Sequence, residues 1–307
     1  MEYINQIVAG DCIEVLGDFP PNIANCVIAD PPYWRVVRKK WDTEHRTIEE
    51  YIEWTRMWIS AVSRVAHPSA TMFLFGYQRN LLPIYNLLLD NGWSFQQEII
   101  VDKGGRSLAG RNTSQYKMFP TTTEAIWFLT RDRSVYVKSL LLQKKKSLGL
   151  TVKDINSALG TSTTGGGMWS IYTGDNVENS IPTEEMWNKL QDILQFKVPY
   201  RKVCPTFNLP YGVTDVWSDF NFYTPGRIHP TQKPVPLIER LVRATTLEGD
   251  LVLDPFAGSN STAIACIMSG RNYLTIEKDS AMVEASKERI YSGEDSLYKT
   301  RHGRSGE

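Results

Sequence analysis

Short apolar runs alternate with helical patterns in two separate stretches of this chain, 1–132 and 213–292. Over 47–66, apolar side chains recur every three or four residues, which is the period of an amphipathic helix. Compact apolar runs, which are typical of buried strands, lie at 71–75, 97–101 and 125–129. Strand and helix patterns in series predict an α/β fold with a mostly parallel sheet.

The block between these two stretches, 133–212, has few strand patterns. Two helices are predicted in it, at 149–160 and 181–194, each with a threonine placed to cap its first turn. We therefore expect a small, mainly helical inserted domain. The polar residues 293–307 predict a flexible tail.

The composition limits the classes of protein to which the chain can belong. It has 34 basic and 34 acidic residues, so any argument for a polyanionic partner must come from local clusters. The four cysteines show neither CxxC spacing nor histidine pairing, which argues against a metal site and a disulfide framework. The chain has no run of 18 apolar residues and no signal-peptide pattern, so we expect no membrane span and a cytoplasmic location.

The stretch VIADPPYW, residues 27–34, is the first candidate site. Pro31 and Pro32 stop the strand that precedes them, because neither can donate to a sheet ladder, and they keep the backbone extended. Asp30 offers an acceptor side chain and Tyr33 a flat ring at the end of this stiff segment. The alternative interpretation is a strand terminator with an exposed turn.

The stretch LVLDPFAGSNST, residues 251–262, is the second candidate site. A predicted strand ends at Asp254, and Gly258 lets the backbone approach a ligand closely in the turn before the next helix. Glu277 ends another predicted strand 19 residues later, at the spacing of an acidic residue that binds ribose hydroxyls. The pattern lacks GxGxxG, so it favours an adenosine ligand over a pyrophosphate. Ordinary βαβ packing is the alternative.

DPPY together with the DPFAG turn resembles the amino-group DNA methyltransferases that use S-adenosylmethionine, and the order of the two motifs resembles their β class. The resemblance implies a Rossmann-like methyltransferase fold with a mostly parallel sheet and a small, mainly helical inserted domain. In this interpretation 1–132 and 213–292 form the catalytic domain, in a circularly permuted motif order. The block 133–212 would be an inserted target-recognition domain.

The resemblance also implies a role for individual residues. The catalytic residues would be Asp30, Pro31, Pro32 and Tyr33. The residues that bind the cofactor would be Asp11, His229, Thr231, Lys233, Asp254, Phe256, Gly258, Ser259 and Glu277.

Several of these assignments have a structural alternative. Asp11 could be a helix cap, the turn at His229 could cap the next helix, and Lys233 could be a solvated charge. The segment 121–132 resembles a family segment that usually carries His-Glu. Because Thr123 replaces that histidine, no catalytic role is assigned to this segment.

In the family, DPPY accompanies adenine N6 methylation more often than cytosine N4 methylation, so the expected product is N6-methyladenine. Asp30 and the Pro31 carbonyl would accept the two hydrogens of the amine, Tyr33 would stack on the base, and the base would be flipped out of the duplex. A cytosine N4 methyltransferase, an RNA methyltransferase and a non-catalytic nucleic-acid-binding protein are the alternatives.

Double-stranded DNA is the expected partner, within a restriction–modification system, and the resemblance leaves a homodimer open. Basic clusters would bind phosphates, although a solvated loop is the alternative for the first of them. The expected DNA-binding residues are Arg35, Arg38, Lys39, Lys40, Lys144, Lys145 and Lys146.

Overall fold

The computed structural model describes residues 3–34, 47–110, 117–174, 180–204, 207–224, 227–229 and 231–302. Its strands are β1 (Gln6–Ala9), β2 (Ala24–Ala29), β3 (Ala66–Gly76), β4 (Trp93–Asp102), β5 (Thr123–Arg131), β6 (Val216–Trp217), β7 (Leu251–Asp254) and β8 (Asn272–Glu277). Its α-helices are α1 (Cys12–Gly17), α2 (Ile48–Val65), α3 (Gln78–Leu81), α4 (Tyr85–Asp90), α5 (Arg133–Leu148), α6 (Val152–Ala158), α7 (Gly167–Tyr172), α8 (Glu184–Leu194), α9 (Val235–Thr245), α10 (Ser261–Ser269) and α11 (Ser280–His302). Short 3₁₀ turns lie at η2 (Leu82–Ile84), η3 (Gly105–Leu108) and η5 (Tyr200–Lys202).

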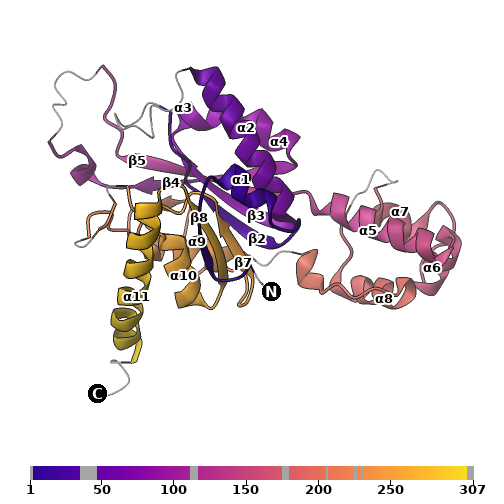
Figure 1. Cartoon of the computed structure of the whole chain (residues 1–307). Helices are drawn as coiled ribbons and strands as arrows, with labels where there is room; N and C mark the ends of the chain where they lie inside the picture. The colour runs from indigo at the N-terminus through magenta and orange to yellow at the C-terminus, as the bar shows by residue number, and fades with distance from the viewer. Residues whose placement is uncertain are drawn as a thin grey trace. The chain divides into compact units, whose positions relative to one another are not determined.

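The chain forms two compact units, Met1–Thr130 with Phe207–Glu307, and Arg131–Thr206. In the first unit the strands form one sheet in the order β1-β8-β7-β2-β3-β5-β4-β6. The pairs from β1 through β8, β7 and β2 to β3 are all parallel, whereas β5 is antiparallel to β3. The predicted α/β fold with a mostly parallel sheet is therefore confirmed (Figure 1).

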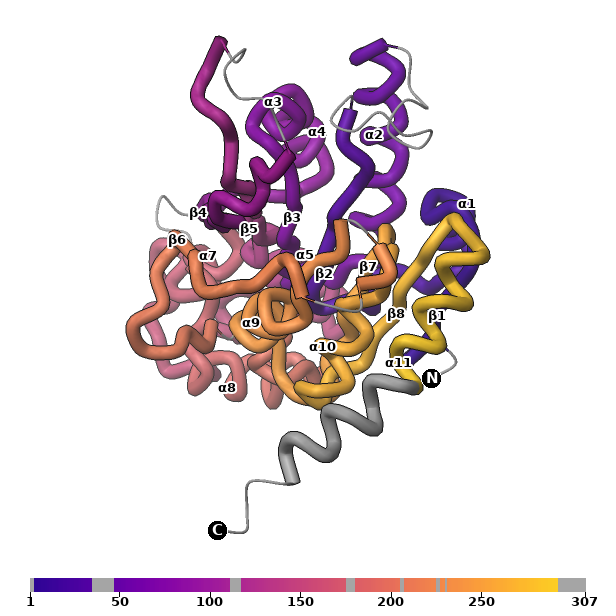
Figure 2. Tube along the Cα trace, turned by 90° about the vertical axis from the view of Figure 1, so that its left-hand side faces the viewer, coloured from indigo at the N-terminus to yellow at the C-terminus, as the bar shows by residue number. Residues whose placement is uncertain are grey.

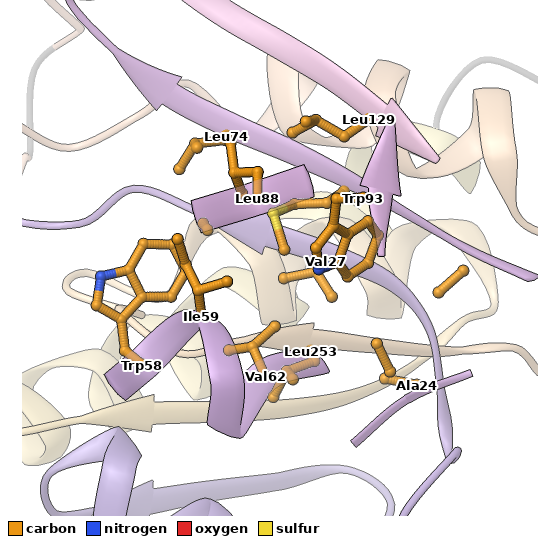
Figure 3. Close-up of a cluster of buried hydrophobic side chains, with 14 of the residues drawn as sticks. Ala24, Val27, Trp58, Ile59, Val62, Leu74, Leu88, Trp93, Leu129 and Leu253 are labelled. Carbon is orange, nitrogen blue, oxygen red and sulfur yellow. The ribbon is translucent and has the colours of Figure 1, made fainter. Parts of the chain in front are cut away.

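Helices cover both faces of this sheet. Val27 and Ala29 of β2 pack in one core cluster with residues of α1, α2 and α4, whereas Cys26 and Ile28 pack in another with residues of α9 and α10. The alternation follows from the strand period of two, which sends successive side chains to opposite faces. Both faces are apolar because both are covered, as expected for a parallel sheet (Figure 1), and Figure 3 shows the cluster that contains Val27.

Helix α2 has the boundaries that its sequence predicts. Thr47 caps the first turn by accepting the Glu50 N–H at 3.2 Å. The apolar stripe buries Trp58, Ile59 and Val62 completely against the sheet, as Figure 3 shows. The period of the apolar residues therefore predicted both the helix and the face that it buries.

The second unit is helical and has a core of its own. Trp169, Trp187 and Leu190 are buried in this core together with residues of α5 and α6. Thr151 caps α6 in a reciprocal capping box, and Thr183 caps α8, so both helices predicted for this block are confirmed. A Cβ at Gly167 would overlap the Ser162 carbonyl oxygen, which explains one glycine of the run at 160–167.

Two helices extend beyond what the sequence pattern predicts. Helix α5 was not predicted, because its lysine-rich second half obscures the apolar period. Helix α11 runs from Ser280 to His302 and so enters the segment 293–307, for which we predict a flexible tail. Among the described residues, no helix has the length and apolar character needed to span a bilayer.

Candidate active site

A row of carboxylates lies at one edge of the sheet. Four neighbouring strands, β1, β8, β7 and β2, run parallel, so their carboxyl ends meet at the same edge. Each of them ends in, or is closely followed by, an acidic residue. In sheet order these residues are Asp11, Glu277, Asp254 and Asp30. This edge is where ligands bind in open α/β sheets.

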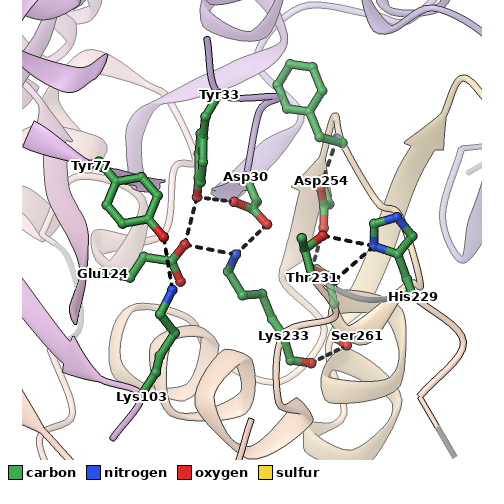
Figure 4. Close-up of polar contacts among 12 residues, drawn as sticks. Asp30, Tyr33, Tyr77, Lys103, Glu124, His229, Thr231, Lys233, Asp254 and Ser261 are labelled. Carbon is green, nitrogen blue, oxygen red and sulfur yellow. Dashed lines mark hydrogen bonds and ion pairs between the residues drawn. The ribbon is translucent and has the colours of Figure 1, made fainter. Parts of the chain in front are cut away.

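Asp30 and Tyr33 lie together directly after β2. The Tyr33 hydroxyl oxygen is 2.5 Å from Asp30 Oδ1 and 3.0 Å from Glu124 Oε1, so its proton can be donated to either carboxylate. Pro31, which lies between Asp30 and Tyr33 in the sequence, is buried, and its burial keeps this segment against the sheet. The sequence thus forms a rigid segment with an acceptor and a ring on it (Figure 4).

Lys233 connects this segment to two distant parts of the chain. Its Nζ donates to Asp30 Oδ2 at 2.7 Å and lies 3.3 Å from Glu124 Oε1. The Lys233 and Glu124 side chains are only 10% and 4% exposed, so the ion pair is largely removed from water. The Lys233 carbonyl accepts a bond from the Ser261 hydroxyl at 2.7 Å, which fixes the backbone beside α10. We call Asp30, Tyr33, Glu124 and Lys233 the catalytic cluster.

The protonation states of the catalytic cluster follow from burial and from opposite charges. Burial alone would raise the pKa of Glu124, but the Lys233 and Lys103 ammonium groups outweigh it and lower the pKa. Burial alone would lower the pKa of Lys233, but Asp30 and Glu124 raise it. Burial and the same two carboxylates raise the pKa of Tyr33 well above its ordinary value. At neutral pH, Glu124 and Lys233 are therefore charged and Tyr33 is a neutral donor.

Tyr77 and Lys103 extend the cluster along the same edge. The Lys103 Nζ donates to the Tyr77 hydroxyl at 3.1 Å. The Tyr77 ring meets the Tyr33 ring edge to face, with centroids 5.4 Å apart. Both residues directly follow a strand, Tyr77 after β3 and Lys103 after β4.

Glu124, Tyr77 and Lys103 were not predicted as site residues. For Glu124, a usable signal was present in the sequence. Glu124, Ile126 and Phe128 alternate along β5, so their side chains point to the same covered face of the sheet. A carboxylate buried among apolar side chains on that face requires a partner.

The glycine turn after β7 is tied to both neighbouring strands. Asp254 is 5% exposed and accepts the Phe256 N–H at 3.0 Å and the Thr262 hydroxyl at 2.5 Å. The Gly258 N–H donates to Glu277 Oε2 at 2.7 Å. Gly258 has a φ of +49°, and a Cβ added to it would meet no atom within 4 Å, so the turn faces open space there.

The remaining predicted cofactor residues lie in varied surroundings. Asp11 caps α1 by accepting the Ile13 N–H at 3.0 Å, so the helix-cap alternative describes its contact. The Phe256 ring packs edge to face on Trp58, with centroids 5.3 Å apart. His229 Nδ1 is 2.9 Å from the Thr231 hydroxyl in the turn before α9. Ser259 is buried, and its carbonyl accepts a bond from Arg289 at 2.6 Å.

The predicted DNA-binding residues divide into two groups. Arg35, Arg38, Lys39 and Lys40 lie outside the described residues. Lys144, Lys145 and Lys146 lie in the last turns of α5, where their side chains are half-exposed or exposed. In the part of the chain that the structure describes, no three histidine, cysteine or acidic side chains gather as a metal-binding group.

Replacing Lys233 by methionine should destabilise the protein. The substitution leaves the Glu124 carboxylate buried without its ammonium partner, which costs about 3–5 kcal/mol in comparable buried pairs. Lys278→Met is the matched control, because Lys278 is 63% exposed beside Asp11 and such a pair contributes about 0–1 kcal/mol. Urea unfolding measures both free energies, and an equal loss in the two variants would contradict the importance of the buried pair.

Asp254 should make stability depend on pH. Burial raises its pKa from 3.8 to about 7. Between these values the folded protein binds a proton that the unfolded chain lacks, so the free energy of unfolding falls as pH rises from about 4 to 7. Relative to Asp254→Asn, the unmodified protein should lose up to about 4 kcal/mol across this interval. Urea unfolding at a series of pH values measures the difference, and parallel curves would show that Asp254 keeps an ordinary pKa.

Comparisons with known proteins agree with this geometry. A family model described as DNA methylase matches residues 24–288. The type II methyltransferase M2.MboI of Moraxella bovis is 23% identical, and the match covers 93% of this chain and 87% of that protein. The type II methyltransferase M.BamHI of Bacillus amyloliquefaciens is 26% identical, and the match covers 94% of this chain but 57% of that protein.

Solved structures share the fold. The crystal structure of an M1.HpyAVI–SAM complex matches with a TM-score of 0.55 at 19% identity, covering 93% of this chain and 98% of that one. The PvuII DNA methyltransferase, described as cytosine-N4-specific, also matches with a TM-score of 0.55, at 14% identity, covering 94% of this chain and 90% of that one. Because the family model spans most of the chain, the predicted family is confirmed: the chain belongs to the DNA methylases that modify exocyclic amino groups.

Proposed function

We propose that this DNA methylase transfers a methyl group from S-adenosylmethionine to the N6 amine of adenine in double-stranded DNA. The observation that carries the proposal is Asp30, an acceptor at the end of β2 held between the Tyr33 hydroxyl and the Lys233 ammonium. The choice of adenine rests on Asp30 as the first residue of DPPY. In the family that the sequence resembles, cytosine N4 methyltransferases mostly carry serine at this position.

The residues at the carboxyl edge fit S-adenosylmethionine. The donor carries a sulfonium cation, and acidic residues end or closely follow four neighbouring strands here, although Asp254 is only partly ionised at neutral pH because burial raises its pKa to about 7. Gly258 leaves open space for a ligand. The two carboxylate oxygens of Glu277 each accept one backbone N–H, from Gly258 and from Asp279. Each oxygen can accept a second hydrogen bond, which the ribose hydroxyls would donate.

We assign the cofactor contacts to both sides of the glycine turn. Asp11 and Glu277 would face the adenosine end, whereas His229 and Thr231 would face the methionine end. The Lys233 ammonium donates to Asp30, so its side chain serves the catalytic cluster. When bound, S-adenosylmethionine supplies an electrophilic methyl group.

The catalytic cluster would position and activate the target amine, which is a poor nucleophile because its lone pair is conjugated with the ring. The Asp30 carboxylate and the Pro31 carbonyl accept its two hydrogens, which favours a pyramidal nitrogen with an available lone pair. The product ammonium is acidic and releases a proton to Asp30 or to water. Correct orientation can supply about 7–11 kcal/mol of the barrier reduction in favourable cases.

The position of Asp30 at a strand end implies that the base leaves the helix before it reacts. Flipping a base out of a duplex costs a few kcal/mol, and stacking on an aromatic ring returns about 1–3 kcal/mol. The Tyr33 ring would provide this stacking surface, because its hydroxyl is already anchored on two carboxylates. A ring held in place before binding loses little entropy when the base arrives.

We assign reading of the DNA target to the helical block 133–212. Its half-exposed or exposed lysines at 144–146 and the basic group at 35–40 would bind phosphates. A cytoplasmic location, a role beside a restriction endonuclease and a homodimer complete the proposal. The relatives named type II methyltransferases support the second of these.

Incubation with unmodified DNA and methyl-labelled S-adenosylmethionine should label N6-methyladenine. Digestion to nucleosides followed by chromatography identifies the labelled base, and unmodified RNA serves as the parallel substrate. Both amines present the same two hydrogens to Asp30, so the identity of the labelled base decides between them. Label in N4-methylcytosine would contradict the choice of adenine. Label in RNA alone would contradict DNA as the substrate.

Replacing Asp30 by alanine should reduce methyl transfer by at least about 100-fold, because the amine loses its charged acceptor. Calorimetry should show that S-adenosylmethionine binds as before, since Asp30 lies on the side of the proposed target base. Asp90→Ala, a change at an exposed carboxylate in α4, should leave both quantities unchanged. Full activity of the Asp30 variant would contradict the mechanism.

A further inference from the structure

Two large apolar side chains project into solvent just before β5. Phe119 is 96% exposed and Met118 is 78% exposed. Adjacent apolar side chains with this exposure are unfavourable in water and mark a surface that meets a partner. Pro120 follows Phe119 and restricts it to extended backbone, so the ring is carried on a stiff stretch of chain.

The chain that carries Phe119 is anchored to the catalytic cluster. The Lys103 N–H donates to the Thr122 carbonyl at 2.9 Å, and the Lys103 ammonium holds Tyr77 at 3.1 Å. Glu124 follows two residues after Thr122 and lies in the catalytic cluster. Phe119 is five residues from Glu124, so the backbone can place it at most about 18 Å from the cluster.

The same segment is strongly basic. From Lys103 to Thr123 the sequence holds four basic residues and no acidic residue, although the chain as a whole has no net charge. Arg106 and Lys117 are exposed among the described residues of this segment. Basic residues in the same segment as two exposed apolar side chains complement a polyanion with an apolar interior, which describes duplex DNA.

The position of the segment agrees with this partner. In Figure 2, the segment of chain that leads into β5 extends away from the sheet. Strand β5 is antiparallel to β3, so its first residues lie at the edge where β2 and β3 end. The exposed ring is therefore carried at the edge to which the target base must come.

We infer that Phe119, with Met118 beside it, is a wedge that enters the DNA stack when the target base leaves it. The inference rests on the proposed function, since only an enzyme that flips a base leaves such a gap. Proteins that distort DNA insert phenylalanine, methionine or leucine between base steps, where the apolar side chain replaces part of the lost stacking. Phe119 would thus be a positioning residue, because it acts on the duplex and touches neither the reacting amine nor the methyl donor.

Kinetics with two DNA substrates test this inference. The first is a duplex with the sequence that the enzyme methylates, and the second is the same duplex with an abasic site opposite the target base. Phe119→Ala should lower kcat/KM on the first by at least about tenfold, because flipping a paired base costs a few kcal/mol. On the second it should approach the unmodified enzyme, since an unpaired base needs less help to leave the stack.

Two further variants sharpen the test. Phe119→Leu keeps an apolar wedge and should retain most of the activity on both substrates. Tyr291→Ala removes another exposed aromatic ring, from helix α11, and should change neither rate. With 2-aminopurine in place of the target base, the unmodified enzyme should raise the fluorescence of the duplex more than Phe119→Ala does, without any methyl transfer.

Three outcomes would overturn the inference. An equal loss by Phe119→Ala on both substrates would make the ring a general docking contact, and no loss on either would make it irrelevant to flipping. A loss on both substrates accompanied by a change in oligomeric state would show that a second copy of the chain covers the ring. If the unmodified enzyme methylates neither duplex but unstacks 2-aminopurine, the proposed function fails and the wedge does not.

Discussion

The contact of one ammonium group with two carboxylates organises the candidate active site. Lys233 donates to Asp30, which is 203 residues away in the chain, and lies 3.3 Å from Glu124, which is 109 residues away. Without this cation, two carboxylates would lie near one another at the edge of an apolar sheet with nothing to offset their repulsion. The Lys233 ammonium supplies that opposite charge, and in the proposed mechanism it would hold Asp30 in place as an acceptor for the two hydrogens of the amine.

The rest of the cluster depends on the same contact. The Tyr33 hydroxyl can donate to Asp30 or to Glu124 because both carboxylates face it. The Tyr33 ring is then supported at its edge by Tyr77, which the Lys103 ammonium holds. In the proposed mechanism this ring would be the stacking surface, and because it is held in place before any base arrives, it would help to orient a weak nucleophile.

The local patterns of the sequence predicted those features that depend on neighbouring residues. The apolar period was sufficient for α2, capping threonines marked α6 and α8, and strand ends followed by proline or glycine located Asp30 and Gly258. Glu124 was missed because its partner Lys233 belongs to a segment brought near only by the order of the strands.

Other features were missed for similar reasons. Tyr77 and Lys103 each follow a strand without a motif around them, so nothing local marks them as neighbours. Sheet order is a property of long-range pairing, and a one-dimensional pattern contains little of it. In α5, lysines occupy positions where an apolar period would have signalled a helix.

The carboxyl edge of the sheet places acidic residues on one side of Asp30 and a mixed set of side chains on the other. From β1 through β8 and β7 to β2, the strands end in, or are followed by, acidic residues, whose charge would attract the cationic methyl donor. Burial raises the pKa of one of them, Asp254, to about 7, so it carries only part of this charge at neutral pH. Beyond β2, Tyr77 follows β3 and Lys103 follows β4, while β4 itself ends in Asp102 and Glu124 lies at the start of β5.

Asp30 lies where these two halves meet, at the end of β2. In the proposed reaction, a methyl group would pass there from a cation to a base that belongs to a polyanion. The acidic residues on the β7 side of Asp30 would hold the sulfonium, and the ring of Tyr33 would hold the base, so that the two reacting atoms would meet at Asp30.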